Sequence, residues 1–267
     1  MFEFALGGIR SGVRGRSFQA VFFLGLVLIG IAYLSGNFSP RQPKTVALDV
    51  GLSGLRFSLI LLNLFWVQEL VAREIDRRTV LFSLAYPVAR SAFLLGRFLA
   101  VLVLSLLAAT IMGFLLGIAV VFAGGQYVQE FSVSVGLPYW IVLIGFWLDA
   151  AVVGAFTLCM ASLATVSFFP IVLGATFAVA GKSLGAALEY IGRGADGDVE
   201  LVSKFSPLLE TVRWVLPDLS RLDWRDWPMY GLPPSIELVG YSTLMAFAYI
   251  ALMLSVAVMQ FSKREFG

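Results

Sequence analysis

The chain has 267 residues, of which 59% are hydrophobic and only 13% are charged, and its mean hydropathy is +0.90. A soluble globular domain carries about twice that share of charged residues, so the composition excludes an ordinary soluble enzyme. The chain has no His and one Cys, which excludes intrachain disulfides, His-ligated metals and haem, and Ser-His-Asp or Cys-His catalytic centres.

Residues 1–16 are predicted to form a short helix on the membrane surface. Phe2, Leu6, Ile9 and Val13 recur at helical spacing, and Arg10 and Arg14 fall on another face. The glycines in this stretch weaken the helix, so it needs the membrane or a neighbouring helix to hold it. A frayed tail with membrane-flanking arginines is the alternative interpretation.

Residues 17–267 are predicted to form a single transmembrane domain with six spans, because each apolar segment approaches the roughly 20 residues that cross a bilayer. The expected spans are Phe18–Leu34, Leu52–Val71, Phe98–Phe122, Tyr139–Ala164, Val166–Ile191 and Ile236–Phe261. The first apolar run is too long for a typical cleaved signal and lacks an A-x-A site. The fold class is therefore an all-α integral membrane protein, with a very tight turn near 164–167.

The distribution of arginine and lysine sets the expected orientation. Basic residues gather in the segments before span one, between spans two and three, and after span six. The positive-inside rule places these segments, and both termini, in the cytoplasm. The expected location is the bacterial inner membrane, with the lipid bilayer as an obligatory partner and no nucleic-acid partner.

The segment 72–97, between spans two and three, is predicted to be a charged cytoplasmic hairpin with an apolar helical stretch. Such a helix can dock into a groove on a soluble partner, although charge alone also fits an ordinary loop. The residues singled out are Arg73, Glu74, Asp76, Arg77, Arg78, Thr79, Leu81, Pro87 and Arg90.

The order of residues in this hairpin resembles the signature of type-2 ABC exporter permeases, roughly R-E-x-G-T-L-x-L-L-L-S-x-P-V-S-R-x-x-F-L-L-G-K. The counterparts include Arg73-Glu74, Arg78-Thr79, Tyr86-Pro87-Val88-Ala89-Arg90 and Phe93-Leu94-Leu95-Gly96-Arg97. Arg78 replaces the usual Gly and Ala89 the usual Ser. The closest resemblance is to the branch that contains the permease for nitrous oxide reductase maturation and the gliding-motility permeases.

The resemblance implies a homodimeric permease that pairs with two separate ATP-binding subunits, with the hairpin acting as a coupling helix. ATP and Mg²⁺ would be bound by the partner, because this chain has no G-x-x-x-x-G-K-[ST] phosphate loop. The chain itself would hold no cofactor, no metal and no catalytic residue. The resemblance also implies that spans one, two and five line the transport path.

Three charged residues inside predicted spans are candidates for the translocation path: Arg56, Asp149 and Lys182. Arg56 and Lys182 are expected toward the outer ends of their spans, where long side chains can reach the headgroups. Asp149 lies near the middle of its span, and its alternative role is a hydrogen bond to Thr157, Ser162 or Arg56. The pairs Gly113–Gly117 and Gly181–Gly185 are expected to allow close helix packing within one subunit.

The outer segment 192–235 lies between spans five and six. Within it, 205–231 is predicted to form an amphipathic helix followed by a re-entrant or interfacial turn, in which Trp224, Trp227 and Tyr230 suit the membrane–water interface. It could also receive a periplasmic or accessory membrane protein.

The leading hypothesis for function is the permease subunit of an ABC exporter. An ion-coupled secondary transporter or channel is the alternative, against which stands the lack of an inverted repeat with broken helices. An intramembrane enzyme lacks paired acids and His, and a purely structural anchor is the remaining hypothesis. The substrate cannot be identified from the residues.

Overall fold

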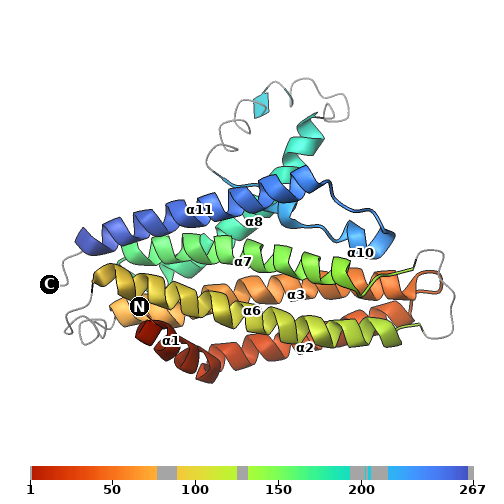
Figure 1. Ribbon diagram of the computed structural model, residues 1–267, viewed down its shortest axis with the longest axis horizontal. Helices are drawn as coiled ribbons and strands as arrows, with labels where there is room; N and C mark the ends of the chain where they lie inside the picture. The colour runs from red at the N-terminus through yellow and green to blue at the C-terminus, as the bar shows by residue number, and fades with distance from the viewer. Residues whose placement is uncertain are drawn as a thin grey trace.

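The computed structural model describes residues 2–76, 89–124, 132–192, 202, 204–205 and 216–263. Within these residues, six helices are long and apolar enough to cross a membrane, and the protein is an all-α, multi-pass membrane protein (Figure 1). The spans are α2 (Arg16–Asn37), α3 (Pro43–Val67) with its continuation to Asp76, α6 (Arg90–Phe122), α7 (Leu137–Leu163), α8 (Phe169–Gly192) and α11 (Ile236–Lys263). All six expected spans are confirmed.

The start of the first helix and the end of the last helix lie at one end of the bundle, here called the terminal end, and the opposite end is called the distal end (Figure 1). The terminal end carries α1 (Phe2–Arg14), α4 (Arg73–Asp76) and the start of α6. The distal end carries the loop between α2 and α3. The turn from α7 to α8 is short, as expected, and Pro170 sits in the first turn of α8, where a helix tolerates proline best.

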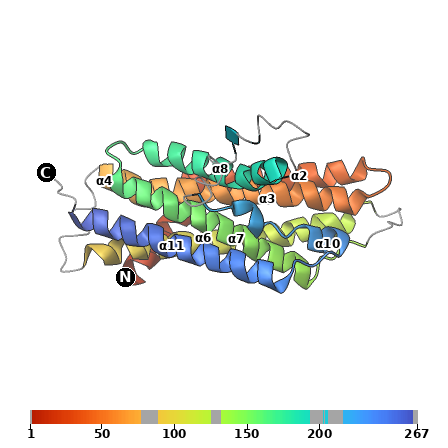
Figure 2. The same cartoon turned by 90° about the horizontal axis from the view of Figure 1, so that it is seen from above.

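The core is built around α3 and α7. In the most apolar stretch of α7, 78% of the residues are buried inside the protein, against 17% in α11. The small residues of α7 allow this close packing: Ala150, Ala151, Gly154 and Ala155 are all buried. Helices α8 and α11 flank α7 (Figure 2), and their outward apolar side chains are left for lipid.

The helix predicted at the N-terminus is confirmed as α1. Its glycines, expected only to weaken the helix, allow it to pack closely on α6. A Cβ at Gly8 would lie 2.7 Å from Ala100 of α6, and one at Gly12 would collide with Leu104. Trp66 donates a hydrogen bond to the carbonyl of Gly12 over 3.2 Å. The glycine face therefore packs on the bundle, and Phe2, Leu6 and Val13 point outward, with 73%, 51% and 47% of their surfaces exposed.

The distal ends of three helices meet at Gly124. Its φ of +62° is a left-handed conformation that favours glycine. A Cβ there would also lie 2.2 Å from Pro43, at the start of α3. Its amide donates to Asn37 Oδ1 over 3.2 Å, so this glycine joins the ends of α2, α3 and α6.

Candidate functional site: a buried ionic network and a charged hairpin

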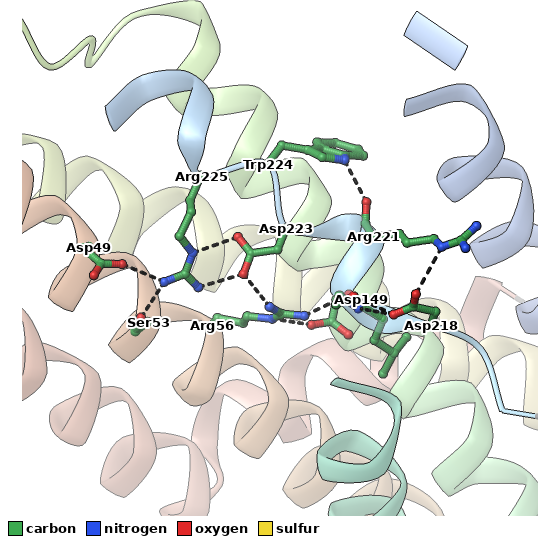
Figure 3. A network of polar contacts seen from close by, with 11 residues as sticks. Asp49, Ser53, Arg56, Asp149, Asp218, Arg221, Asp223, Trp224 and Arg225 are labelled. Carbon is green, nitrogen blue, oxygen red and sulfur yellow. Dashed lines mark hydrogen bonds and ion pairs between the residues drawn. The ribbon is translucent and has the colours of Figure 1, made fainter. Parts of the chain in front are cut away.

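Arg56 of α3 is the centre of a buried ionic network in the distal half of the bundle (Figure 3). Its side chain is only 2% exposed. The guanidinium donates from Nε to Asp149 Oδ2 over 2.6 Å, from Nη1 to Asp223 Oδ2 over 2.8 Å, and from Nη2 to the Leu219 carbonyl over 3.0 Å. One side chain thus connects α3, α7 and the segment 216–231.

Arg225 makes a second guanidinium centre beside the first. It donates from Nε and Nη2 to the two oxygens of Asp223, each over 2.8 Å, and from Nη1 to Asp49 and Ser53 of α3. Burial lowers the pKa of Arg225, but the Asp223 and Asp49 carboxylates raise it by more, so the pKa lies above its ordinary value. Arg225 therefore stays charged, and Asp223 is shared between two arginines.

Aromatic and charge contacts complete the network. The ring of Phe146 lies 5.3 Å from the Arg56 guanidinium and 5.8 Å from that of Arg225, which is cation–π range. Lys182 of α8 is exposed but lies close enough to interact electrostatically with Arg56 and Asp149. Three cations, with Lys182 included, thus face three carboxylates, so the network is balanced in charge.

The segment 216–231 enters the bundle because glycines on the spans make room for it. A Cβ at Gly145 of α7 would lie 2.5 Å from the Leu222 carbonyl, and Cβ atoms at Gly181 and Gly185 of α8 would meet Leu219 and Ser220. The segment consists of the 3₁₀ turn η3 (Leu219–Leu222) and the short helix α10 (Asp226–Tyr230). Asp218 caps η3 by accepting from the amide and hydroxyl of Ser220.

These contacts identify the partners of the charges that lie inside the spans. Asp149 pairs with Arg56, which is one of the partners expected for it. The expectation that Arg56 reaches the lipid headgroups is wrong. Asp149, Asp223 and the Leu219 carbonyl accept hydrogen bonds from its guanidinium inside the protein. The three path candidates lie together, but Arg56 and Asp149 are sealed from solvent and only Lys182 is exposed.

In the described part of the outer segment, the chain turns into the bundle, which agrees with the expected re-entrant turn. The expected position of Trp224 at the membrane–water interface is wrong. Trp224 is 4% exposed and packs on Gly145, because the turn is buried in protein rather than in lipid headgroups. The expected amphipathic helix falls mostly on residues 206–215, outside the described residues. The Gly113–Gly117 and Gly181–Gly185 pairs pack within the subunit, as expected.

The terminal end carries a second ionic contact, at the base of the hairpin 72–97. Arg97 of α6 donates from Nη2 to Glu74 of α4 over 2.5 Å. Its guanidinium also lies 5.5 Å from the Phe93 ring. The two arms of the hairpin are therefore joined where they leave the bundle.

Neighbouring helices fix the same base from both sides. Phe93 packs edge-on against Phe4 of α1 at 5.6 Å and stacks on Phe261 of α11 at 5.9 Å. Arg90 donates to the Ser262 carbonyl over 3.1 Å. Arg73 and Asp76 are exposed beside the base, and Arg77, Arg78, Thr79, Leu81 and Pro87 lie outside the described residues.

The helix leading into the hairpin is not a regular α-helix. Residues Gln68–Ala72 form the π-helical turn η1 between α3 and α4. Such turns are rare in proteins, but those that occur are often found at functional sites. Here the wider turn keeps Gln68, Leu70 and Val71 buried while Glu69 turns toward Ser17, whose hydroxyl donates to it over 2.6 Å.

Clusters of metal-ligating side chains are absent from the part of the chain that the structure describes. No three His, Cys, Asp or Glu side chains gather there closely enough to hold a metal ion. Cys159 is buried in α7, as expected for a small apolar side chain. A scan against protein-family models and a search of the curated proteins find no match to this sequence.

Proposed function

We propose that this chain is the membrane-spanning permease subunit of an ABC exporter and that a separate ATP-binding subunit docks on the hairpin 72–97. The single observation that carries the proposal is the Glu74–Arg97 contact at the hairpin base. These two residues stand near the two ends of the exporter-like signature, and their contact joins the ends in space. A partner that pushes on the hairpin would thereby move α3 and α6 together.

Further features of the terminal end support this role. Arg73 and Asp76 offer exposed charge beside the hairpin, and the π-helical turn η1 gives the arm that carries them a local irregularity at which it can bend. In the proposed orientation the terminal end faces the cytoplasm, where an ATPase would be found. The chain lacks a phosphate loop, so energy for transport would come from that partner.

The proposed transport path lies between two copies, along α2, α3 and α8. Phe57 is 53% exposed although α3 is otherwise a central helix, and Phe23 of α2 and Val179 of α8 are also exposed. Lys182 and Ser53 add polar groups to these helices. The exposed parts of α2, α3 and α8 could thus serve both as lining and as contact with a second copy.

An ion-coupled transporter or channel is the second candidate, and one observation favours it. Asp149 Oδ1 is buried and has no hydrogen-bond partner among the described residues. A carboxylate oxygen left unpartnered in a membrane span is a candidate ion or proton site. The Arg56 contact on the other oxygen argues for a fixed structural carboxylate instead.

Co-purification from cells that express the tagged chain at native level tests the proposal. The informative variant combines Arg73→Glu with Asp76→Lys, because both residues are exposed and the net charge is unchanged. The matched control combines Arg41→Glu with Glu237→Lys, which are exposed near the distal end. The proposal expects a phosphate-loop ATPase with the wild type and control and at least a fivefold loss with the hairpin variant.

The contrary result is a stable oligomer of the chain alone, whose transport in vesicles follows an ion gradient without ATP. That result would make the second candidate the better account. An ATPase that is retained equally by the hairpin variant would place the docking site elsewhere.

A further inference from the structure

A pocket of about 580 Å³ opens at the terminal end, between α1 and the end of the α3–η1–α4 helix. Its volume is within the range of small-molecule sites. The side chains that line it are Arg10, Ser11, Arg14, Glu69, Arg73 and Glu74. Neither the ionic network nor the docking proposal uses its α1 wall.

The charges in the pocket favour an anion. Glu74 is already taken by Arg97 at 2.5 Å, and Glu69 accepts from Ser17 and lies 3.6 Å from Arg73. Within the described residues, Arg10 and Arg14 have no ion-pair partner. Two exposed guanidinium groups one helical turn apart suit a phosphate, whose oxygens match the fork of an arginine.

The surroundings of the pocket favour a lipid as the source of that phosphate. Leu6 lies four residues before Arg10, and Val13 lies three after it. Both are therefore its neighbours on the surface of α1, which corrects the expectation that the arginines lie on a separate face. Both side chains are about half exposed, and Phe2 continues the same apolar stripe. The glycine face of α1 is already occupied by α6, so the apolar stripe is left for acyl chains beside the arginines.

We propose that this pocket binds the head group of an anionic phospholipid. Arg10 and Arg14 contact the phosphate, Arg73 adds positive charge from the opposite wall, and Leu6 and Val13 contact the acyl chains. The bound lipid joins α1 to the base of the hairpin. The proposal rests on this pocket alone and holds whichever energy source drives transport.

Native mass spectrometry measures how much phosphatidylglycerol binds to the chain. The protein is kept in detergent with added phosphatidylglycerol and is released from the detergent in the spectrometer. Phosphatidylcholine with the same acyl chains tests the need for net negative charge, and inorganic phosphate tests for a soluble ligand. Arg10→Gln with Arg14→Gln removes the phosphate contacts. Ser11→Trp fills the pocket without changing the charge, so it separates a shaped site from general attraction.

The control combines Arg16→Gln with Lys263→Gln, which removes the same charge from exposed positions at the same end that do not line the pocket. We expect phosphatidylglycerol occupancy to fall at least fivefold in the double arginine variant and in Ser11→Trp, and less than twofold in the control. A cooperative thermal unfolding transition in detergent serves as the control that each variant is folded.

Three results would overturn the proposal. Equal loss in the control and the double arginine variant would show unspecific attraction. Displacement of the lipid by millimolar inorganic phosphate would assign the pocket to a soluble anion. Unchanged lipid binding, together with loss of a co-purified ATP-binding protein in the double arginine variant, would make the α1 wall part of a protein interface.

Discussion

The distal half and the terminal end of the bundle are both held by ion pairs, but the pairs differ in how deeply their side chains are buried. In the distal half, Arg56 and Arg225 make several bonds to three carboxylates, and Arg56 is 2% exposed. Toward the terminal end, the ion pair between Glu74 and Arg97 joins side chains that are 24% and 11% exposed, and Arg73 lies 3.6 Å from Glu69. The first arrangement holds the segment 216–231 inside the bundle, and the second holds a more exposed hairpin base, on which the proposed partner would act.

The difference fits a division of labour between the ends. A guanidinium buried among carboxylates is costly to separate, because each charge would be left without compensation in a low-dielectric environment. A single pair near the membrane surface is worth much less. We therefore expect the distal end to govern stability and the terminal end to govern coupling.

Replacing Arg56 with Met should have the largest effect. Asp149 and Asp223 would lose their shared cation inside the bundle, and breaking such a buried pair costs about 3–5 kcal/mol. Thermal unfolding in detergent should show a large fall in Tm or loss of monodisperse protein. Arg56→Met combined with Asp149→Leu should recover part of the loss. A wild-type Tm for the single variant would contradict the role given to the network.

Gly145→Ala should have the next largest effect, because the added Cβ would lie 2.5 Å from the Leu222 carbonyl. Overpacking of this kind costs about 1–3 kcal/mol, and the segment 216–231 should become more accessible to protease. Gly30→Ala is the matched control, since nothing lies within 4 Å of a Cβ at that helical glycine. If both variants behave alike, the segment is not held against α7.

The hairpin base should give a smaller effect on stability and a larger one on coupling. Glu74→Arg places two cations together and should lower the free energy of unfolding by about 1–2 kcal/mol. The exchange Glu74→Arg with Arg97→Glu should restore more than half of that loss and of any ATPase activity in the co-purified complex. Lack of rescue by the exchange would argue against the pair.

Lys182→Gln should have the smallest effect on stability, below about 0.5 kcal/mol, because the side chain is exposed. If α8 lines the transport path, the same variant should lower transport in vesicles several-fold while Tm stays constant. A fall in Tm comparable to that of Arg56→Met would instead show that the charge of Lys182 contributes as much to stability as the buried guanidinium does.

Sequence reasoning located the spans because the signal is long: about 20 apolar residues in succession have few alternative structures. The same reasoning found Arg56 and Asp149, since a charge stands out in an apolar run. The sequence does not single out Asp223 and Arg225, because acids and bases in a loop look ordinary until the loop folds into the bundle. It does not single out Asp49 because the second span is expected to begin at Leu52, whereas α3 begins at Pro43. The stretch LPDLSRLDW at 216–224 alternates charged and apolar residues. This alternation is the signal that could have indicated a segment folded against the spans.

The N-terminal helix shows a second limit. Its period predicts an apolar stripe of Phe2, Leu6, Ile9 and Val13. Ile9 instead packs partly buried against the core, and the glycines between these residues count in the sequence only as weakening residues. Their role depends on Ala100 and Leu104 of α6, which are far away in the sequence. Close approach between two helices depends on the residues of both. The sequence pattern of one helix therefore does not predict which helix its glycines contact.

The most direct test of the account is site-specific photo-crosslinking from Asp76, which is exposed beside the hairpin base. A photoreactive residue there, in cells that express the chain at native level, should capture an ATP-binding protein. The same residue at Arg221, exposed in the distal segment, should not capture it. A crosslink at both positions, or at neither position with the chain folded and in the membrane, would contradict the proposed docking of an ATPase on this hairpin.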